Sequence, residues 1–206
     1  RPNMPSYLTL RAPVHIEVDP IKRSRFFADA APVQSEQEAL AFIAAVRDRF
    51  PDAGHHCFAW RLQSGDLGFR TSDDGEPGGT GGPPILAHID GAKLRGVVIV
   101  VTRYFGGTKL GKGGLIRAYG GTAGAAIEQA EIIEVIETQP VVIEYAYSDQ
   151  GLVEGVLRGL GLQSGNAVFG ANVTHTVAVP TEQVDTLWEQ LKDTTSGRIQ
   201  RNSERR

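Results

Sequence analysis

A single stretch, Gly96 to Gly121, places the strongest constraint on the fold of this chain. It begins with an apolar run from Val97 to Val101 and then enters a segment rich in glycine and lysine. The run predicts a buried strand, the glycines predict a loop, and the pattern from about Leu115 to Ala130 predicts a helix. A strand, a glycine-rich loop and a helix form the arrangement that binds phosphate through backbone N–H groups. The stretch therefore predicts binding of an anionic partner before it predicts catalysis.

The charge of the chain is small in total but uneven along its length. The formal net charge is −3 over 206 residues. Between Gly91 and Ile127, however, every charged residue is basic: Lys93, Arg95, Arg103, Lys109, Lys112 and Arg117. A basic patch within a mildly acidic chain is a local electrostatic signal for an anionic partner.

The basic stretch supplies the candidate binding residues. We expect its cations to contact phosphates, its glycines to expose N–H groups, and its aromatic rings to stack on bases. The candidate anion or RNA site consists of Arg103, Tyr104, Phe105, Gly106, Gly107, Lys109, Gly111, Lys112, Gly113, Gly114 and Arg117. Two alternatives stay open. In the first, the glycine-rich loop is a turn that only serves tight packing. In the second, the ring of Tyr104 or Phe105 is part of the core and the Arg103 stem lies along apolar surface.

The loop is close to a nucleotide-binding motif but departs from it. The pattern requires Ser or Thr after the lysine to hold Mg²⁺, and here Gly113 follows Lys112. The next acidic residue is Glu128, so no strand-borne acidic partner is apparent. The sequence therefore predicts no nucleotide hydrolysis, no cofactor and no metal.

A second group of polar residues suggests a cleft. The turn Ser72–Pro77 carries three carboxylates, which suit a divalent cation or acid–base work, although Asp-Gly and Glu-Pro are also ordinary turn chemistry. The strand predicted near residue 55 begins with two histidines and Cys57, for which we expect polar-contact and structural roles. The cleft candidates are His55, His56, Asp73, Asp74 and Glu76.

The first part of the chain alternates strands and helices. Ser35 with Glu38 predicts a capped helix that ends at Pro51, since Ser and Glu at this spacing form a capping box. The other expected elements are strands at 14–21, 25–33, 55–62, 67–72 and 97–101, a helix at 85–89 and the long helix at 115–130. Close packing of the glycines of the long helix on a sheet would compensate for their low helix propensity.

The segment Thr138-Gln139-Pro140 predicts a domain boundary, with domains at 1–138 and 139–206. After it, we expect a strand to Tyr147, a helix capped by Asp149, and one bent strand or two strands within 167–179. A helix capped by Thr181 and a last strand at 198–202 complete the pattern. The order βαββαβ is that of a ferredoxin-like domain.

The cysteine content and the length of the apolar runs indicate the cellular compartment of the protein. A single cysteine excludes an intramolecular disulfide and fits a reducing compartment. No apolar run reaches the ~18 residues that span a bilayer. We therefore expect a cytoplasmic protein without a membrane partner.

Three long blocks of sequence resemble the IMPACT/YigZ family. They are HHCFAW at 55–60, SDDGEPGGTGGPPIL at 72–86 and VVIVVTRYFGGTKLGKGGLIRAYG at 97–120. Residues 10–137 carry the resemblance, and residues 140–206 are similar to the family's C-terminal domain in pattern more than in motif. The two-domain form resembles the bacterial members.

The resemblance implies an α+β fold in two domains. The first is expected to be a left-handed βαβ sandwich similar to domain IV of elongation factor G and to some small-molecule kinases. The second is expected to be similar to the ferredoxin-like domain V of that factor. The eukaryotic family member is a regulator of translation with a different N-terminal partner domain, which this chain does not show.

Three functions are compatible with these observations. The first is a non-catalytic protein that binds RNA or the ribosome and regulates translation or a stress response. The second is an enzyme that acts on a small phosphorylated or peptidic substrate through the acidic turn 73–76. The third is a regulator that binds only a protein partner of the translation machinery.

Overall fold

The computed structural model describes residues 6–63 and 68–201. The chain divides between Val135 and Ile136 into two compact units, the larger from Tyr7 to Val135 and the smaller formed by the residues after it together with Ser6. Each unit has its own hydrophobic core. The two-part α+β organisation expected from the sequence is confirmed, whereas separate folding at a 138/139 boundary stays a prediction.

The larger unit is built on a five-stranded sheet with the order β2-β3-β6-β4-β5. Every neighbouring pair in it is antiparallel. Its strands are β2 (Val14–Glu17), β3 (Arg25–Pro32), β4 (His55–Arg61), β5 (Phe69–Ser72) and β6 (Val97–Tyr104). A separate two-stranded sheet pairs β1 (Ser6–Leu10) with β7 (Ile132–Ile136).

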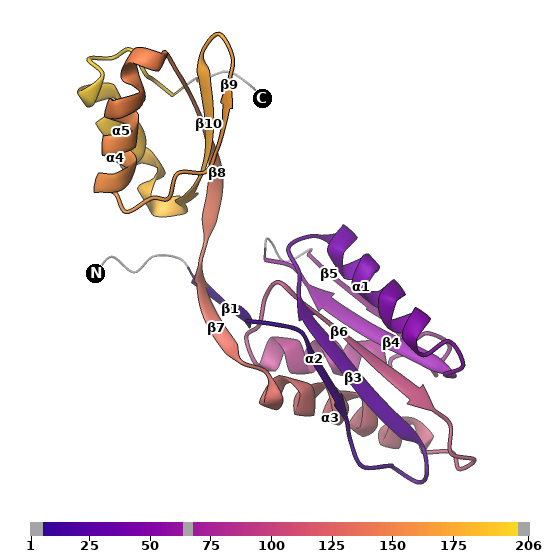
Figure 1. The fold of residues 1–206 in the computed structure, drawn as a ribbon. Coiled ribbons are helices and arrows are strands. Elements are labelled where there is room, and N and C mark those ends of the chain that lie inside the picture. Colours follow the sequence, from indigo (N-terminus) through magenta and orange to yellow (C-terminus); the bar gives the residue numbers. More distant parts are fainter. Residues whose placement is uncertain (1–5, 64–67, 202–206) are drawn as a thin grey trace. The chain divides into compact units, whose positions relative to one another are not determined.

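Helices cover both faces of the five-stranded sheet (Figure 1). Helix α1 (Glu36–Arg49) packs on one face, and α2 (Gly82–Gly91) and α3 (Gly111–Gln129) pack on the other. The segment β3-α1-β4 is a crossover that skips β6, because β3 and β4 lie on either side of that strand. The left-handed sense of this sandwich, expected from the resemblance, stays a prediction.

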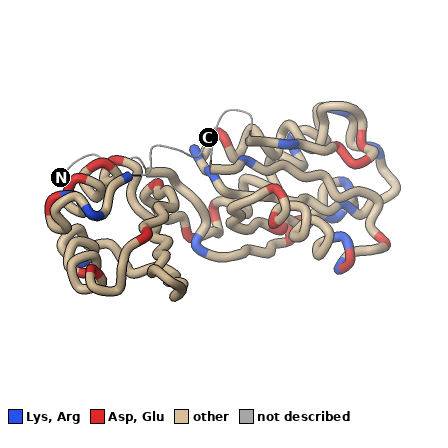
Figure 2. The backbone as a smooth tube through the Cα atoms, turned by 90° about the horizontal axis from the view of Figure 1, so that it is seen from above, with Lys and Arg blue, Asp and Glu red and all other residues tan. Residues whose placement is uncertain are grey.

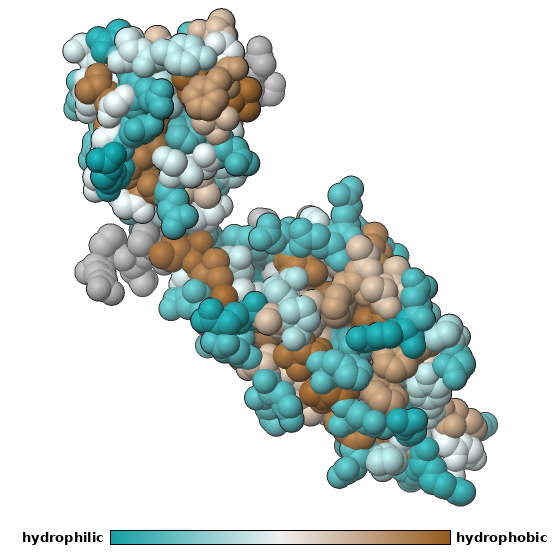
Figure 3. Space-filling model, viewed as in Figure 1, coloured by the Kyte–Doolittle hydropathy of each residue, from teal (hydrophilic) through white to brown (hydrophobic). Residues whose placement is uncertain are grey.

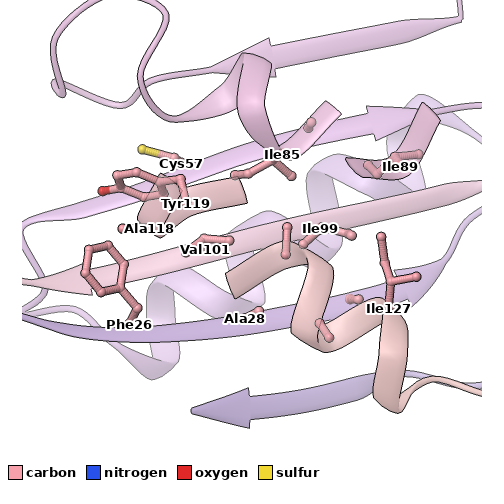
Figure 4. Packing of buried hydrophobic residues seen from close by; sticks show 14 of the residues in the cluster. Phe26, Ala28, Cys57, Ile85, Ile89, Ile99, Val101, Ala118, Tyr119 and Ile127 are labelled. Atoms are coloured by element: carbon pink, nitrogen blue, oxygen red, sulfur yellow. The ribbon is translucent and has the colours of Figure 1, made fainter. Parts of the chain in front are cut away.

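The central strand β6 is the buried strand that the sequence predicts. Val97 through Val101 are each 0% exposed, since alternate side chains face the two helical layers. On the α3 side, Val101 and Ile99 pack with Phe26 and Tyr119 (Figure 4). A continuous apolar run is what a strand covered on both faces requires.

The start of α1 confirms Ser35 as the expected N-cap, with Glu38 bonded one residue further back than in a capping box. The Ser35 hydroxyl accepts a hydrogen bond from the Glu38 N–H at 3.2 Å, and Glu38 in turn accepts one from the N–H of Gln34 at 2.8 Å. The Ser35 bond satisfies one of the N–H groups that a helix start leaves unpaired, whereas Glu38 bonds the N–H of Gln34, the residue before the N-cap.

Helices α2 and α3 differ from expectation at their ends and in what their glycines contact. Helix α2 runs from 82 to 91 rather than 85 to 89, and α3 begins at Gly111 rather than Leu115. Gly120 and Gly124 face the ring of His88 on α2, so the close packing is between helices and not against the sheet. A side chain at either glycine would meet that ring.

The smaller unit is a three-stranded antiparallel sheet covered by two helices. In chain order its elements are β8 (Thr138–Tyr145), η1 (Tyr147–Asp149), α4 (Gln150–Gly159), β9 (Asn166–Phe169), β10 (Val173–Pro180), η2 (Thr181–Gln183) and α5 (Val184–Thr194). The strand order β8-β10-β9 is that of the first three strands of a ferredoxin-like domain. The region 167–179 forms two strands, which settles that alternative.

The expected last strand at 198–202 is wrong for residues 198–201, and Asn202 lies outside the described residues. Ile199 instead inserts into the core at 3% exposure. Arg198 donates two hydrogen bonds to the carboxylate of Asp149, at 2.7 and 3.1 Å, and this lowers the pKa of Asp149. These two contacts hold the segment away from a strand conformation beside β8.

Apolar side chains also lie on the surface of the smaller unit. Tyr147 and Phe169 stack with ring centroids 6.4 Å apart, and Phe169 is 62% exposed. Figure 3 shows apolar side chains gathered on the side of this unit that carries β9 and β10. In the part of the chain described here, no helix combines the length and the apolar character needed to cross a membrane.

The separate cores predict independent unfolding of the two units. Leu187 is 0% exposed in the core of the smaller unit. We expect Leu187→Ala to lower the stability of that unit by about 2–5 kcal/mol through the cavity it creates. Amide exchange measured by mass spectrometry should rise in residues 138–194 and stay unchanged in β6. Equal loss of protection in β6 would show that the chain unfolds as one body.

Candidate anion-binding site

Four segments meet at one end of the five-stranded sheet of the larger unit. The turn before β3 and the loop after β6 are adjacent because Arg25 pairs with Tyr104. The start of β4 joins them because His55 pairs with Arg103. The acidic turn at 73–76 follows β5 and forms hydrogen bonds with His55 and His56 at the start of β4. Antiparallel pairing and these side-chain contacts thus bring together four segments that are far apart in the chain.

The turn before β3 and the loop after β6 are packed backbone to backbone. Ile21 and Ser24 exchange two hydrogen bonds of 2.9 Å, which closes a two-residue turn. Ser24 Oγ then accepts a hydrogen bond from the N–H of Gly106 at 3.2 Å. A Cβ atom on Gly106 would collide with the backbone of Arg23. Gly106 therefore serves close packing, as one of the sequence alternatives held.

Exposed cations gather on these two segments and on the start of α3. These cations are Lys22, Arg23, Lys109, Lys112 and Arg117. Within the described residues, none of the five forms an ion pair with a carboxylate. Figure 2 shows several basic positions grouped at one end of the larger unit, with acidic positions nearby. Because these charges have no partner of their own, their potential is available to a ligand.

The segment between β6 and α3, residues 105–110, is called the Gly/Lys loop, and it leaves backbone N–H donors free. In the described chain, the N–H groups of Gly107, Thr108 and Lys109 are paired with no backbone acceptor. The loop is shorter than expected, because Gly111, Lys112, Gly113 and Gly114 belong to the first turn of α3. No side chain caps this helix and no acidic residue lies in its first turn, so its N-terminal N–H groups and positive dipole end are uncompensated.

Arg103 does not belong to the exposed group, which corrects its expected phosphate contact. It is 5% exposed, and its Nη1 donates to Oε1 of Glu76 at 2.7 Å. Tyr119 donates to the same oxygen at 2.6 Å. The guanidinium also lies over the ring of Phe26, and its Nε is buried without a partner. A cation held in this way is part of the core.

The two aromatic residues after Arg103 have different environments. Tyr104 is half-buried, donates a hydrogen bond to Asp52 at 2.8 Å and packs edge-on against Phe27. Burial and the Asp52 contact raise the pKa of its phenol. Phe105 is 59% exposed. Of the two rings, Phe105 is the one that a base could reach.

The carboxylates of the acidic turn are engaged within the fold. Asp73 accepts hydrogen bonds from the N–H groups of Gly79, Gly81 and Gly82, at 2.8 to 3.0 Å, and so organises the glycine-rich segment at the start of α2. Glu76 is the buried partner of Arg103. These contacts replace the open cleft that the sequence alternative requires.

Asp74 connects the acidic turn to β4 and α1. Its carboxylate accepts from the N–H of His56 at 2.7 Å and from Arg47 at 2.9 Å. His56 is buried and its Nε2 lies 2.9 Å from the carbonyl of Phe50. His55 lies 2.8 Å from the carbonyl of Asp74 and 3.8 Å from Glu76. The five cleft candidates thus converge, but as a bonded network.

Cys57 lies beneath this network. Its thiol is buried and donates to the carbonyl of Asp73 at 3.0 Å. Burial raises the pKa of this thiol to about 12, and it raises the pKa of Tyr119 as well. Both groups are protonated near neutral pH. Among the described residues, no three His, Cys, Asp or Glu side chains are placed to hold a metal ion.

The sequence candidates omitted Lys22 and Arg23. Both have positive φ, 47° and 67°, in the turn that packs on Gly106. The signal available in the sequence was a basic dipeptide between two strands. Its distance of more than 80 positions from Gly106 in the sequence concealed the packing of this turn on the loop after β6.

Together, the fold and the site define a class: a two-unit α+β protein whose larger unit presents unpaired cations and free backbone donors at one end of its sheet. The model of the Impact N-terminal domain matches residues 22–127, and that of a domain of unknown function, DUF1949, matches residues 143–198. The chain belongs to the IMPACT family.

Individual relatives cover nearly the whole chain. An IMPACT family member in the pol 5′ region of Thermus thermophilus is 43% identical over 180 residues, which cover 87% of this chain and 97% of that protein. The IMPACT family member YigZ of Escherichia coli is 37% identical over 201 residues, covering 96% and 97%. A crystal structure of a hypothetical protein matches with a TM-score of 0.76 and 34% identity, covering 98% of this chain and 100% of that one.

The packing of the loop predicts opposite effects for two glycine substitutions. Gly106→Ala forces a methyl group into the Arg23 backbone and should cost about 1–3 kcal/mol, as overpacking does. Gly121→Ala is the matched control, because Gly121 is exposed in the middle of α3 with no atom near the added methyl. It should stabilise the chain by about 0.5–1 kcal/mol. Urea unfolding measures both, and equal midpoints for the two variants would contradict the assignment.

Proposed function

We propose that this protein binds the phosphate backbone of RNA through the end of its larger unit, without catalysing a reaction, and that it acts in this way on the ribosome or another part of the translation machinery. The observation that carries the proposal is the group of exposed cations that form no ion pair within the described residues, beside backbone N–H groups without a backbone acceptor there. Backbone phosphates are the anions that such a surface meets in RNA.

The hairpin turn supports a binding role for its charges. A two-residue turn with positive φ at both positions favours Asn-Gly, because other side chains are strained there. Lys22 and Arg23 occupy these positions with φ of 47° and 67°. Backbone strain of about 1–3 kcal/mol per residue is found most often at functional sites. A function that needs the two charges accounts for their place in the turn.

The exposed ring of Phe105 at this site supports a single-stranded ligand. Phe105 projects from the Gly/Lys loop and is 59% exposed, while Arg103 stacks behind it with 5.5 Å between guanidinium and ring centroid. A base stacked on such a ring gains about 1–3 kcal/mol in single-strand complexes. Duplex RNA has no unstacked base to offer, so we expect weaker binding of duplexes.

The salt dependence of binding tests the proposal. If about four of the five cations contact phosphates, log K for a single-stranded RNA should fall against log salt with a slope of about −3. Lys109→Ala and Lys112→Ala should each flatten the slope by about 0.7, whereas Phe105→Ala should lower affinity with little change in slope. Fluorescence anisotropy of a labelled poly-uridine twelve-mer gives these values.

Matched controls separate the site from general charge. Lys192 is an exposed lysine on α5 of the smaller unit, and Lys192→Ala should leave both affinity and slope unchanged. Urea midpoints for each variant show that the fold is intact. If the wild-type protein binds no RNA at low salt, or if the Lys109 and Lys192 variants bind alike, a protein partner becomes the better explanation for this surface.

A further inference from the structure

The edge strand β9 of the smaller unit lacks the features that protect most sheet edges. The strand order is β8-β10-β9, so within the described chain β9 pairs with β10 alone (Figure 1). Natural edge strands are protected by charged side chains, by proline or by bulges. The opposite edge strand, β8, carries both Pro140 and Glu144. In contrast, β9 reads Asn-Ala-Val-Phe and holds neither a charge nor a proline.

Large apolar side chains are exposed on both faces of β9. Val168 is 67% exposed and pairs with Thr174, so it lies on the face of the sheet away from the core. Phe169 is 62% exposed and pairs with the core residue Val173, so it lies on the opposite face. Exposed apolar side chains along an unpaired edge are typical of a surface that associates with another strand.

The backbone groups that β9 offers to a further strand are those of Ala167 and Phe169. The N–H of Gly170 donates to the carbonyl of Asn172 at 3.0 Å, next to the first pair of the two strands. Bonded and non-bonded pairs alternate along an antiparallel ladder. Val168 therefore bonds to β10, and the N–H and C=O groups of Ala167 and Phe169 point outward.

These outward groups fit a second copy of the same strand, related by a two-fold axis at Val168. Antiparallel pairing about that axis places Ala167 of one copy opposite Phe169 of the other, and each such pair exchanges two hydrogen bonds. On one face the two Val168 side chains meet. On the other face each Phe169 ring covers the small Ala167 of the second copy. Because both copies use the same surface, the contact closes on itself.

Charge favours the same occupant. Like charges that lie directly opposite each other destabilise a pair of strands. Since β9 contains no charged residue, nothing in the strand opposes pairing with an identical copy. The apolar side chains that pairing would cover also need no complementary charge on a different protein.

We propose that the chain forms a weak dimer through β9, in which the three-stranded sheets of two smaller units join into one continuous sheet. Hydrogen bonds of Ala167 and Phe169 hold the strands together, and Val168 and Phe169 supply the apolar contact. Since β9 has four residues, the buried area is well below the ~1,200 Å² of standard interfaces, and we expect a dissociation constant of about 0.1 mM. The contact is independent of the proposed RNA surface.

Residue-resolved amide exchange over a concentration series of the full chain tests the proposal. The amides of Ala167 and Phe169 should exchange fast at about 10 μM protein and become protected at about 1 mM, where the dimer prevails. The amide of Val168 bonds to β10 and should be protected at both concentrations, which makes it an internal control. Sedimentation velocity should show the dimer over the same range. Protection of Ala167 and Phe169 at every concentration would show that the chain covers this edge itself, and that result, or a monomer throughout, overturns the proposal.

Paired lysine variants locate the contact. Val168→Lys removes the valine contact and places two like charges at the axis, so it should weaken dimerisation at least about tenfold. Val142→Lys is the matched control, because Val142 is 56% exposed on the same face of the sheet but lies in β8. It should leave dimerisation unchanged, and urea midpoints of both variants should show that the fold is intact.

A charge exchange separates repulsion at the axis from damage to the strand. An equimolar mixture of the Val168→Lys and Val168→Glu chains should dimerise again, because opposite charges then meet across the axis. Each variant alone should remain at least about tenfold weaker than the wild-type chain. Equal weakening by Val142→Lys and Val168→Lys, or no recovery in the mixture, would show that the copies do not meet at β9.

Discussion

A single buried carboxylate, that of Glu76, holds together the end of the larger unit that carries the candidate site. Its Oε1 accepts hydrogen bonds from Arg103 on β6 and from Tyr119 on α3, and the carboxylate itself belongs to the turn after β5. Three elements that are distant in the sequence are thus joined at one oxygen atom. A buried ion pair is costly to desolvate, so its worth lies in fixing one arrangement of these elements. That arrangement places the Gly/Lys loop beside the hairpin turn.

The same constraint separates charges that serve the fold from charges that remain available to a ligand. Arg103, Glu76, Asp73 and Asp74 all have partners inside the fold, whereas Lys109 and the four other cations of the candidate site form no ion pair within the described residues. Residues of both kinds lie within the sequence blocks that mark the IMPACT family. One block can therefore hold both residues that pack and candidate binding residues, and only the partners of each side chain distinguish the two.

The sequence predicted elements well where a physical pattern was local. The apolar run of β6 and the Ser35 N-cap are examples, because strand burial and N-terminal capping depend on neighbouring residues. Prediction failed where the deciding contact was distant. Burial of Arg103 depends on Glu76, the packing of the turn before β3 on Gly106 depends on sheet pairing, and the absence of a strand at 198–201 depends on Asp149 and Ile199. None of these partners can be inferred from spacing.

A double-mutant cycle between Glu76 and Arg103 tests most directly whether this buried pair organises the site. Arg103→Met alone leaves a buried carboxylate without its cation and should cost about 3–5 kcal/mol in urea unfolding. Adding Glu76→Gln should recover part of that loss, which gives a coupling energy of about 2–3 kcal/mol for residues in direct contact. Additive effects, with each single variant costing less than about 1 kcal/mol, would contradict the central role assigned to the pair.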